Sequence, residues 1–131
     1  MGDLFPHFLK YGVDMYKLFS KIIVIFCLLT TVAFAYQEPR QVRASHILVK
    51  SRAEAIQLKK DIDNGGSFYQ YAKMYSLCPS SQNGGDLGYF RRGQMVQPFE
   101  DEAFELSIGE VSEPVGTEFG WHLIKVTDKV H

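Results

Sequence analysis

Two histidines and one cysteine are the residues of this chain whose types and placement could do chemistry. His46 and His122 each lie in a run rich in β-forming residues. A neutral imidazole carries one hydrogen-bond donor and one acceptor, so two histidines on different strands can bond each other or a hydroxyl. A buried histidine pair kept only for structural reasons would give the same pattern, and that alternative stays open.

The cysteine, Cys78, has two readings. A nucleophilic thiolate would need a lowered pKa and an activating neighbour. The milder hypothesis, which we favour, is that the thiol tunes hydrogen bonding and electrostatics around the reacting group. A thiol enzyme is a weaker alternative, since the only other cysteine, Cys27, lies in an apolar N-terminal run. His46, His122 and Cys78 lack the spacing of metal ligands, so we expect no metal site and no cofactor.

A glycine-rich run separates these residues in the sequence. Gly84-Gly85-Asp86-Leu87-Gly88 is followed by Tyr89 to Met95, with a further glycine at 93. Glycines permit left-handed turns around a short strand. Asp86 can accept a hydrogen bond from its own turn. The run predicts a short strand between two tight turns.

The elements that must position these residues follow from periodicity and capping. Ser51 with Glu54, and Ser67 with Gln70, form capping boxes that predict two helix starts. Strands and helices do not alternate as βαβ units, so the predicted class is α+β with an antiparallel sheet. The first predicted elements are a strand at 42–50, a helix that follows Ser51 and ends at 64–66, and a second helix that follows Ser67. After them we predict a loop at 79–84, a strand at 86–90, a helix in the acidic stretch 100–105, and a last strand at 120–128.

Three motifs in this order resemble the parvulin family of peptidyl-prolyl cis/trans isomerases. They are Ala44 to Lys50, the glycine-rich run with Tyr89 to Met95, and Phe119 to Val126. The resemblance covers roughly residues 42–128. It implies the FKBP-like superfold, a four-stranded antiparallel sheet with packed helices, and catalysis of rotation about X–Pro bonds.

The resemblance also implies a site with two parts. The barrier of about 18–20 kcal/mol comes from amide resonance, so a catalyst must hold the proline and favour the twisted amide. Some parvulins carry Asp where this chain has Cys78, so neither group is chemically indispensable. The implied proline pocket is Leu87, Met95, Phe99 and Phe119, and the implied catalytic polar floor is His46, Cys78, Thr117 and His122.

Partners follow from the same comparison and from charge. We expect proline-containing polypeptide substrates, and a formal net charge of −1 gives no reason to expect nucleic acid. The phosphate-directed branch of the family inserts a basic loop after the first strand, whereas Lys50-Ser51-Arg52 here passes straight into a helix. Activity should therefore not depend on phosphorylation. Arg91 and Arg92 could favour acidic substrate segments or could be solvent-facing turn residues.

Two further alternatives concern function and assembly. A non-catalytic chaperone or peptide-binding module could use the same cleft, although it would not need the polar floor. We expect a monomer.

The N-terminal segment differs in composition from the rest. Lys17 and Lys21 precede an apolar run at 22–35 that ends in Ala33-Phe34-Ala35, typical of a secretory signal peptide over residues 1–35. The mature chain would begin at Tyr36, with a linker at 36–41, and would be exported. Met15 could be the true start. An uncleaved membrane anchor at 22–35 is the alternative, although about 20 apolar residues are needed to span a bilayer.

Overall fold

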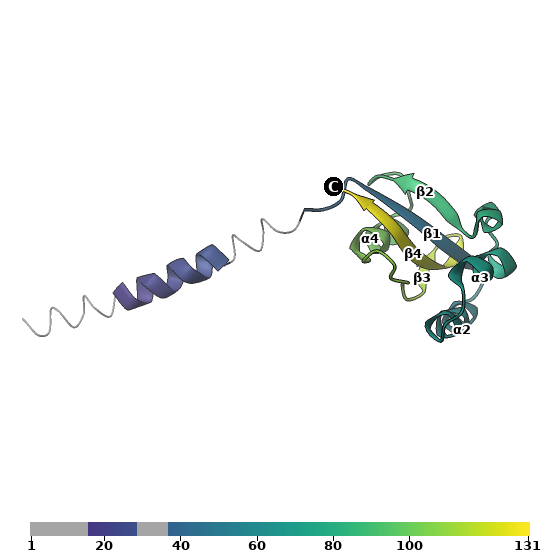
Figure 1. Cartoon of the computed structure of the whole chain (residues 1–131), viewed down its shortest axis with the longest axis horizontal. Helices are drawn as coiled ribbons and strands as arrows, with labels where there is room; N and C mark the ends of the chain where they lie inside the picture. Colours follow the sequence, from purple (N-terminus) through teal and green to yellow (C-terminus); the bar gives the residue numbers. More distant parts are fainter. Residues whose placement is uncertain (1–15, 29–36) are drawn as a thin grey trace, which may run out of the picture. The chain divides into compact units, whose positions relative to one another are not determined.

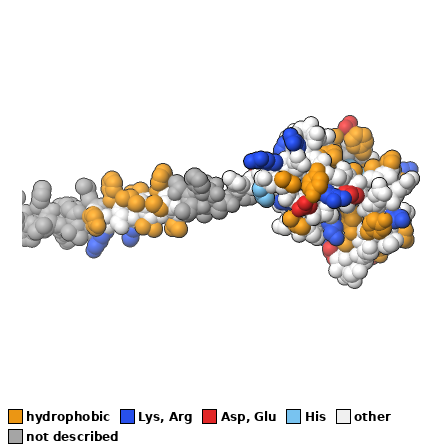
Figure 2. Space-filling view, turned by 45° about the horizontal axis from the view of Figure 1, so that its top comes forward, with side chains coloured by type: hydrophobic (Ala, Val, Ile, Leu, Met, Phe, Trp, Pro, Cys, Tyr) orange, Lys and Arg blue, Asp and Glu red, His pale blue; other side chains and the backbone are white. Residues whose placement is uncertain are grey.

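The computed structural model describes residues 16–28 and 37–131. The chain divides into two compact units, Met1–Gln37 and Glu38–His131, which are described separately. In the first unit, residues 16–28 form a helix whose surface carries exposed apolar side chains (Figure 2). Among the described helices, none has the length and apolarity needed to cross a membrane. The predicted start at Met15 and the predicted cleavage site after Ala35 lie outside the described residues.

The second unit contains all of the named elements. It is an α+β fold, and its predicted four-stranded antiparallel sheet is confirmed (Figure 1). The strands lie in the order β2-β1-β4-β3. In chain order the elements are β1 (Gln41–Val49), α2 (Arg52–Asp63), α3 (Phe68–Tyr75), η1 (Pro79–Asn83), β2 (Asp86–Phe90), α4 (Gln97–Glu105), β3 (Val115–Thr117) and β4 (Gly120–Val130).

Both predicted helix starts are confirmed by their caps. The Ser51 side chain accepts a hydrogen bond from the Glu54 amide, and the Ser67 side chain accepts one from the Gln70 amide. Each bond satisfies an amide that has no partner inside the first turn of its helix. The residues before α2 and α3 therefore fix where both helices begin.

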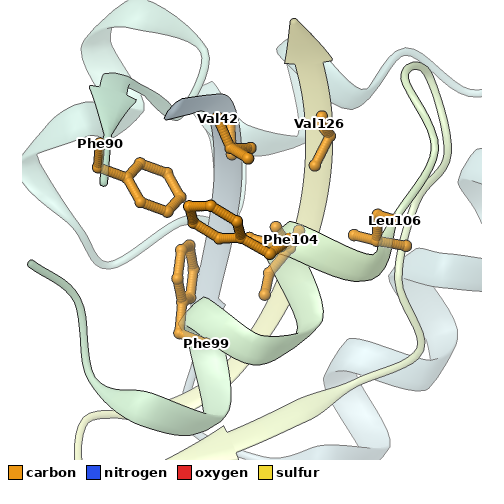
Figure 3. Packing of buried hydrophobic residues seen from close by; sticks show 9 residues of the cluster. Val42, Phe90, Phe99, Phe104, Leu106 and Val126 are labelled. Atoms are coloured by element: carbon orange, nitrogen blue, oxygen red, sulfur yellow. The ribbon is translucent and has the colours of Figure 1, made fainter. Parts of the chain in front are cut away.

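Alternate residues of each strand point to opposite sides of the sheet. Apolar side chains on both faces are buried against helices. Toward α2 and α3, one apolar cluster forms from Ile47, Val49, Ala55, Leu58, Phe68, Ala72 and Leu123. Toward α4, a second cluster forms from Val42, Ala44, Phe90, Phe99, Ala103, Phe104, Leu106, Ile124 and Val126. In Figure 3 the rings of Phe90, Phe104 and Phe99 fill the space between α4 and the strands. We call these the α2/α3 face and the α4 face.

Several boundaries differ from the sequence prediction. The segment Pro79–Asn83, predicted as a loop, forms a short 3₁₀ helix that ends at Gly84 in a left-handed conformation. The last strand continues to Val130, because the first strand begins at Gln41 and pairs with it. Part of the predicted linker packs on the unit, since Pro39 is buried and the Arg40 amide donates to the Val130 carbonyl at 2.7 Å.

Candidate active site

The register of β1 and β4 brings the two histidines together on the α4 face. His122 lies opposite Leu48, and His46 lies opposite Ile124, so the histidines are diagonal neighbours on adjacent strands. Their Nδ1 atoms are 3.0 Å apart, and their rings are stacked with centroids 5.2 Å apart. The predicted pairing of the histidines is thus a direct hydrogen bond.

Thr117 continues this contact from the end of β3. Its Oγ1 lies 2.7 Å from His122 Nε2, and it accepts a hydrogen bond from the Phe119 amide at 3.2 Å. The simplest assignment has the threonine hydroxyl donating to His122 Nε2 and His122 Nδ1–H donating to His46 Nδ1. The proton of His46 is then on Nε2, a buried atom without a hydrogen-bond partner among the described residues.

Burial keeps both rings uncharged. His46 and His122 are 5% and 4% exposed. Burial, followed by the proximity of His122, lowers the pKa of His46 to about 4. Burial also lowers the pKa of His122 below its usual value. At neutral pH the pair is therefore a neutral hydrogen-bonding unit.

An apolar cavity of about 330 Å³ opens beside the histidine pair. Phe99 of α4 closes one side with its ring edge-on to both imidazoles, at centroid distances of 5.6 Å and 5.3 Å. Gln94 and Val96 also line the cavity and were missed, because their sequence pattern is that of an ordinary turn. The lining residues are His46, Leu87, Gln94, Met95, Val96, Phe99, Phe119 and His122, which include all four residues predicted for the pocket.

The glycine-rich run approaches β1 closely at one point. Gly85 has φ of +87°, and a Cβ built there would lie 2.2 Å from the backbone oxygen of His46. The Gly85 carbonyl accepts a hydrogen bond from the His46 amide at 3.0 Å. Asp86 accepts a bond from the Gly88 amide, as predicted, and its carboxylate pairs with Arg43. This arrangement fixes the backbone that carries His46.

In the described contacts, Cys78 makes no hydrogen bond to this set. It is half-buried at the start of η1, and its amide is 3.4 Å from Ser76 Oγ. Cys78 is not among the residues that line the cavity. Its catalytic role stays a prediction. Within the described residues, no group of three or more His, Cys, Asp or Glu side chains is placed to hold a metal ion.

The two arginines after β2 lie in a turn where the Arg92 side chain and the Arg91 backbone both have partners within the protein. Arg92 contacts the carboxylates of Glu38, Glu100 and Asp101 and lies over the ring of Phe104. The amide of Arg91 donates to the Gln94 side chain at 2.8 Å. Neither arginine lines the cavity, so they form a structured turn beside it.

An apolar cavity above a neutral histidine pair, on a sheet covered by helices on both faces, is what a prolyl isomerase domain needs. Comparison with known proteins agrees: residues 28–130 match the PPIC-type PPIase domain. The chain belongs to this family of peptidyl-prolyl cis/trans isomerases, the parvulins, and the expectation from the three sequence motifs is confirmed.

Curated and structural relatives support the same placement. The foldase protein PrsA of a Geobacillus species is 53% identical over 90 residues, covering 68% of this chain and 33% of that protein. A parvulin-like PPIase of Rickettsia typhi is 46% identical over 93 residues, covering 68% of this chain and 33% of that protein.

Among solved structures, PrsA of Bacillus anthracis matches with a TM-score of 0.70 at 44% identity, covering 72% of this chain and 44% of that one. The parvulin of Nitrosopumilus maritimus matches with a TM-score of 0.63 at 44% identity, covering 68% of this chain and 97% of that one. The chain spans about a third of the length of the curated relatives it matches.

Proposed function

We propose that this chain is a cofactor-free foldase that rotates X–Pro bonds in unphosphorylated polypeptides outside the cytosol. The observation that carries the proposal is the apolar cavity beside the neutral histidine pair. The cavity suits a proline ring, because Met95 can adapt its shape and the aromatic residues supply large contact area.

The chemistry requires little beyond this arrangement. Rotation breaks amide resonance but makes no bond, so the catalyst needs only to bind the twisted form more tightly than either planar form. Each tenfold in rate requires about 1.4 kcal/mol of such preference. The neutral imidazoles offer a polar surface that does not ionise at physiological pH, and His46 Nε2 is a buried polar atom that no described residue hydrogen-bonds.

The independence from phosphorylation is supported by the charges around the cavity. No lysine or arginine is among the described residues that line it. Only Lys50 and Ser51 separate β1 from α2, as in the predicted uninterrupted passage, and the Arg52 guanidinium lies over the Trp121 ring. Arg92 is paired with carboxylates. A phosphate group before the proline would find no free cation in this lining.

Export as a monomer completes the proposal. The basic and apolar composition of residues 17–35 supports a signal peptide with cleavage after Ala35. Expression from Met1 or Met15 in a secreting cell should give a soluble protein whose first residue is Tyr36. Terminal sequencing of a membrane-bound protein that keeps the apolar run would show the anchor instead.

The experiment that tests the activity is a prolyl isomerisation assay of the full chain on a panel of X–Pro peptides. We expect turnover on unphosphorylated peptides, with no gain from phosphoserine or phosphothreonine before proline and no loss with a chelator. Binding of the peptides without acceleration would show the non-catalytic chaperone or peptide-binding module.

A further inference from the structure

A buried carboxylate, Glu100, lies in the first turn of α4 immediately behind the cavity wall. The residue is 8% exposed, whereas its neighbour Asp101 has a side chain that is 52% exposed. A buried charge is costly unless it is paired or hydrogen-bonded. The partners of Glu100 therefore indicate why it is there.

These partners belong to the loop that precedes the helix. Glu100 Oε2 accepts a hydrogen bond from the Gly93 amide at 2.7 Å and lies 3.5 Å from the Met95 amide. Its Oε1 lies 3.9 Å from a guanidinium nitrogen of Arg92. Hydrogen bonds to a carboxylate are short and strong, so the 2.7 Å bond from the Gly93 amide is the strongest of these contacts.

This contact is not an ordinary helix cap. The cap residue of α4, Val96, makes no side-chain cap bond, and Glu100 reaches back beyond it to the turn before the helix. That turn is closed by two bonds between Arg91 and Gln94, and Gly93 within it has φ of +88°. The carboxylate therefore ties a self-contained turn to α4.

The turn and the residue after it carry two walls of the cavity, Gln94 and Met95. Phe99, a third wall, immediately precedes Glu100 on α4. One buried side chain thus joins the loop half of the cavity to its helical half. A displacement of the turn would move Met95 relative to Phe99 and change the width of the cavity.

We propose that Glu100 is a positioning residue for substrate binding: its hydrogen bond to the Gly93 amide holds Met95 and Gln94 at the spacing from Phe99 that fits a proline ring. This inference rests on the proposed isomerase function for its kinetic consequence, and on the loop geometry alone for its structural consequence. Because Glu100 acts through Met95, its loss should weaken substrate affinity and should lower kcat by no more than the loss of the Met95 side chain does.

Three variants of the full chain separate the acceptor from the charge. Glu100→Met keeps the length of the side chain and removes the acceptor. Glu100→Gln keeps an oxygen that can accept from the Gly93 amide. Asp101→Asn is the matched control, since Asp101 contacts the same Arg92 at 2.8 Å but no amide of the turn in the described contacts.

The first measurement is amide hydrogen exchange by NMR, which needs no activity. We expect Glu100→Met to accelerate exchange at Gly93 at least tenfold, with β1 and β4 amides unchanged. Glu100→Gln should restore most of the protection, and Asp101→Asn should match the wild type. Unchanged protection of the Gly93 amide in Glu100→Met would overturn the proposal. If Glu100→Met does not fold, the Gly93 exchange rate of Glu100→Gln is compared with that of the wild type instead. The proposal predicts that Glu100→Gln keeps most of the protection.

The second measurement is KM and kcat on an X–Pro peptide. Glu100→Met should raise KM at least fivefold, should lower kcat by no more than Met95→Ala does, and should add little to the KM of Met95→Ala in the double variant. Additive effects, or a loss in kcat alone, would contradict positioning through Met95. If the wild type shows no turnover, the proposed function fails, and the peptide Kd measured by titration replaces KM in the same comparison.

Discussion

The two faces of the sheet use the same strands for different purposes. On the α2/α3 face, the buried cluster consists of apolar side chains alone, such as Ile47 and Leu123. His46 and His122 directly precede these two residues in the chain and point to the α4 face. There they are buried polar groups beside a cavity. Glu100 is buried on that side as well.

This difference shows how a small domain separates stability from function. Because strand side chains alternate, one residue of register decides whether a position supports the fold or the site. The α2/α3 face can be optimised for packing without touching the cavity. The α4 face keeps buried polar atoms and an open cavity, both of which cost stability. The predictions below test whether the α2/α3 face affects only stability and the α4 face also affects activity.

The largest effect is expected where the backbone of the α4 face is most crowded. Gly85→Ala places a Cβ 2.2 Å from the His46 carbonyl oxygen in addition to the strain of φ +87°. We expect a loss of about 3 kcal/mol or more in the free energy of unfolding and a fall in kcat/KM of at least about tenfold. Gly88→Ala is the control, since φ is +71° but nothing lies within 4 Å. Chemical denaturation of both variants should give a much smaller loss in the free energy of unfolding for Gly88→Ala than for Gly85→Ala. Equal losses would show that the close approach to His46 does not affect stability.

Acid should destabilise the protein through the histidine pair. The folded pKa of His46, about 4, lies below its unfolded value near 6.5, so the unfolded state binds the extra proton between these values. Stability should fall as the pH drops through this window, by on the order of 3 kcal/mol. Denaturant unfolding at pH 7, 5.5 and 4 measures the loss.

The control for this prediction is His46→Phe, which cannot titrate. Its stability should change much less between pH 7 and 4, with the remaining change owed partly to His122, whose pKa is also lowered. An identical acid loss in this variant and in the wild type would place the titrating groups elsewhere.

Met95→Ala should weaken substrate binding and turnover while leaving the fold intact. Met95 is only partly buried but lines the cavity, so its loss removes contacts to the proline ring. We expect kcat/KM to fall about tenfold, which corresponds to about 1.4 kcal/mol. Met74→Ala on α3, where the side chain is 63% exposed, should leave peptide kinetics unchanged. Similar losses at Met74 and Met95 would argue against a defined proline pocket.

Replacement of Cys78 should have the smallest effect. If the thiol only tunes electrostatics, Cys78→Asp should keep kcat/KM within about tenfold of the wild type. Cys78→Ser keeps a similar volume and should also stay active. A fall of several orders of magnitude in both folded variants, with binding unchanged, would indicate a nucleophilic thiolate.

Local signals explain what could be predicted from the sequence. Ser51 and Ser67 cap their helices through amides three residues away, so their effect is visible in the sequence itself. The four pocket residues and the histidine pair followed from the resemblance to parvulins, and the structure brings them together. The predicted strand at 86–90 also has the bounds of β2.

Long-range contacts explain what could not be predicted. The acidic stretch around Glu100 suggested only a favourable helix N-terminus, because its bonds to the Gly93 and Met95 amides depend on the fold of the preceding turn. The ion pair of Arg92 with Glu38 could not be predicted, because the two residues are 54 positions apart in the chain. The length of β4 was underestimated because its last residues are ordered by pairing with Gln41.

The most direct test of the division between the faces compares Phe68→Ala with Phe99→Ala. Both rings are buried, at 6% and 3% exposed, so each variant should lose about 3–5 kcal/mol of stability. Prolyl isomerisation should be measured at a temperature where circular dichroism shows both variants folded. We predict that Phe68→Ala, on the α2/α3 face, keeps kcat/KM within about twofold, whereas Phe99→Ala, at the cavity, loses at least about tenfold. Equal activity losses in the two variants would contradict the account.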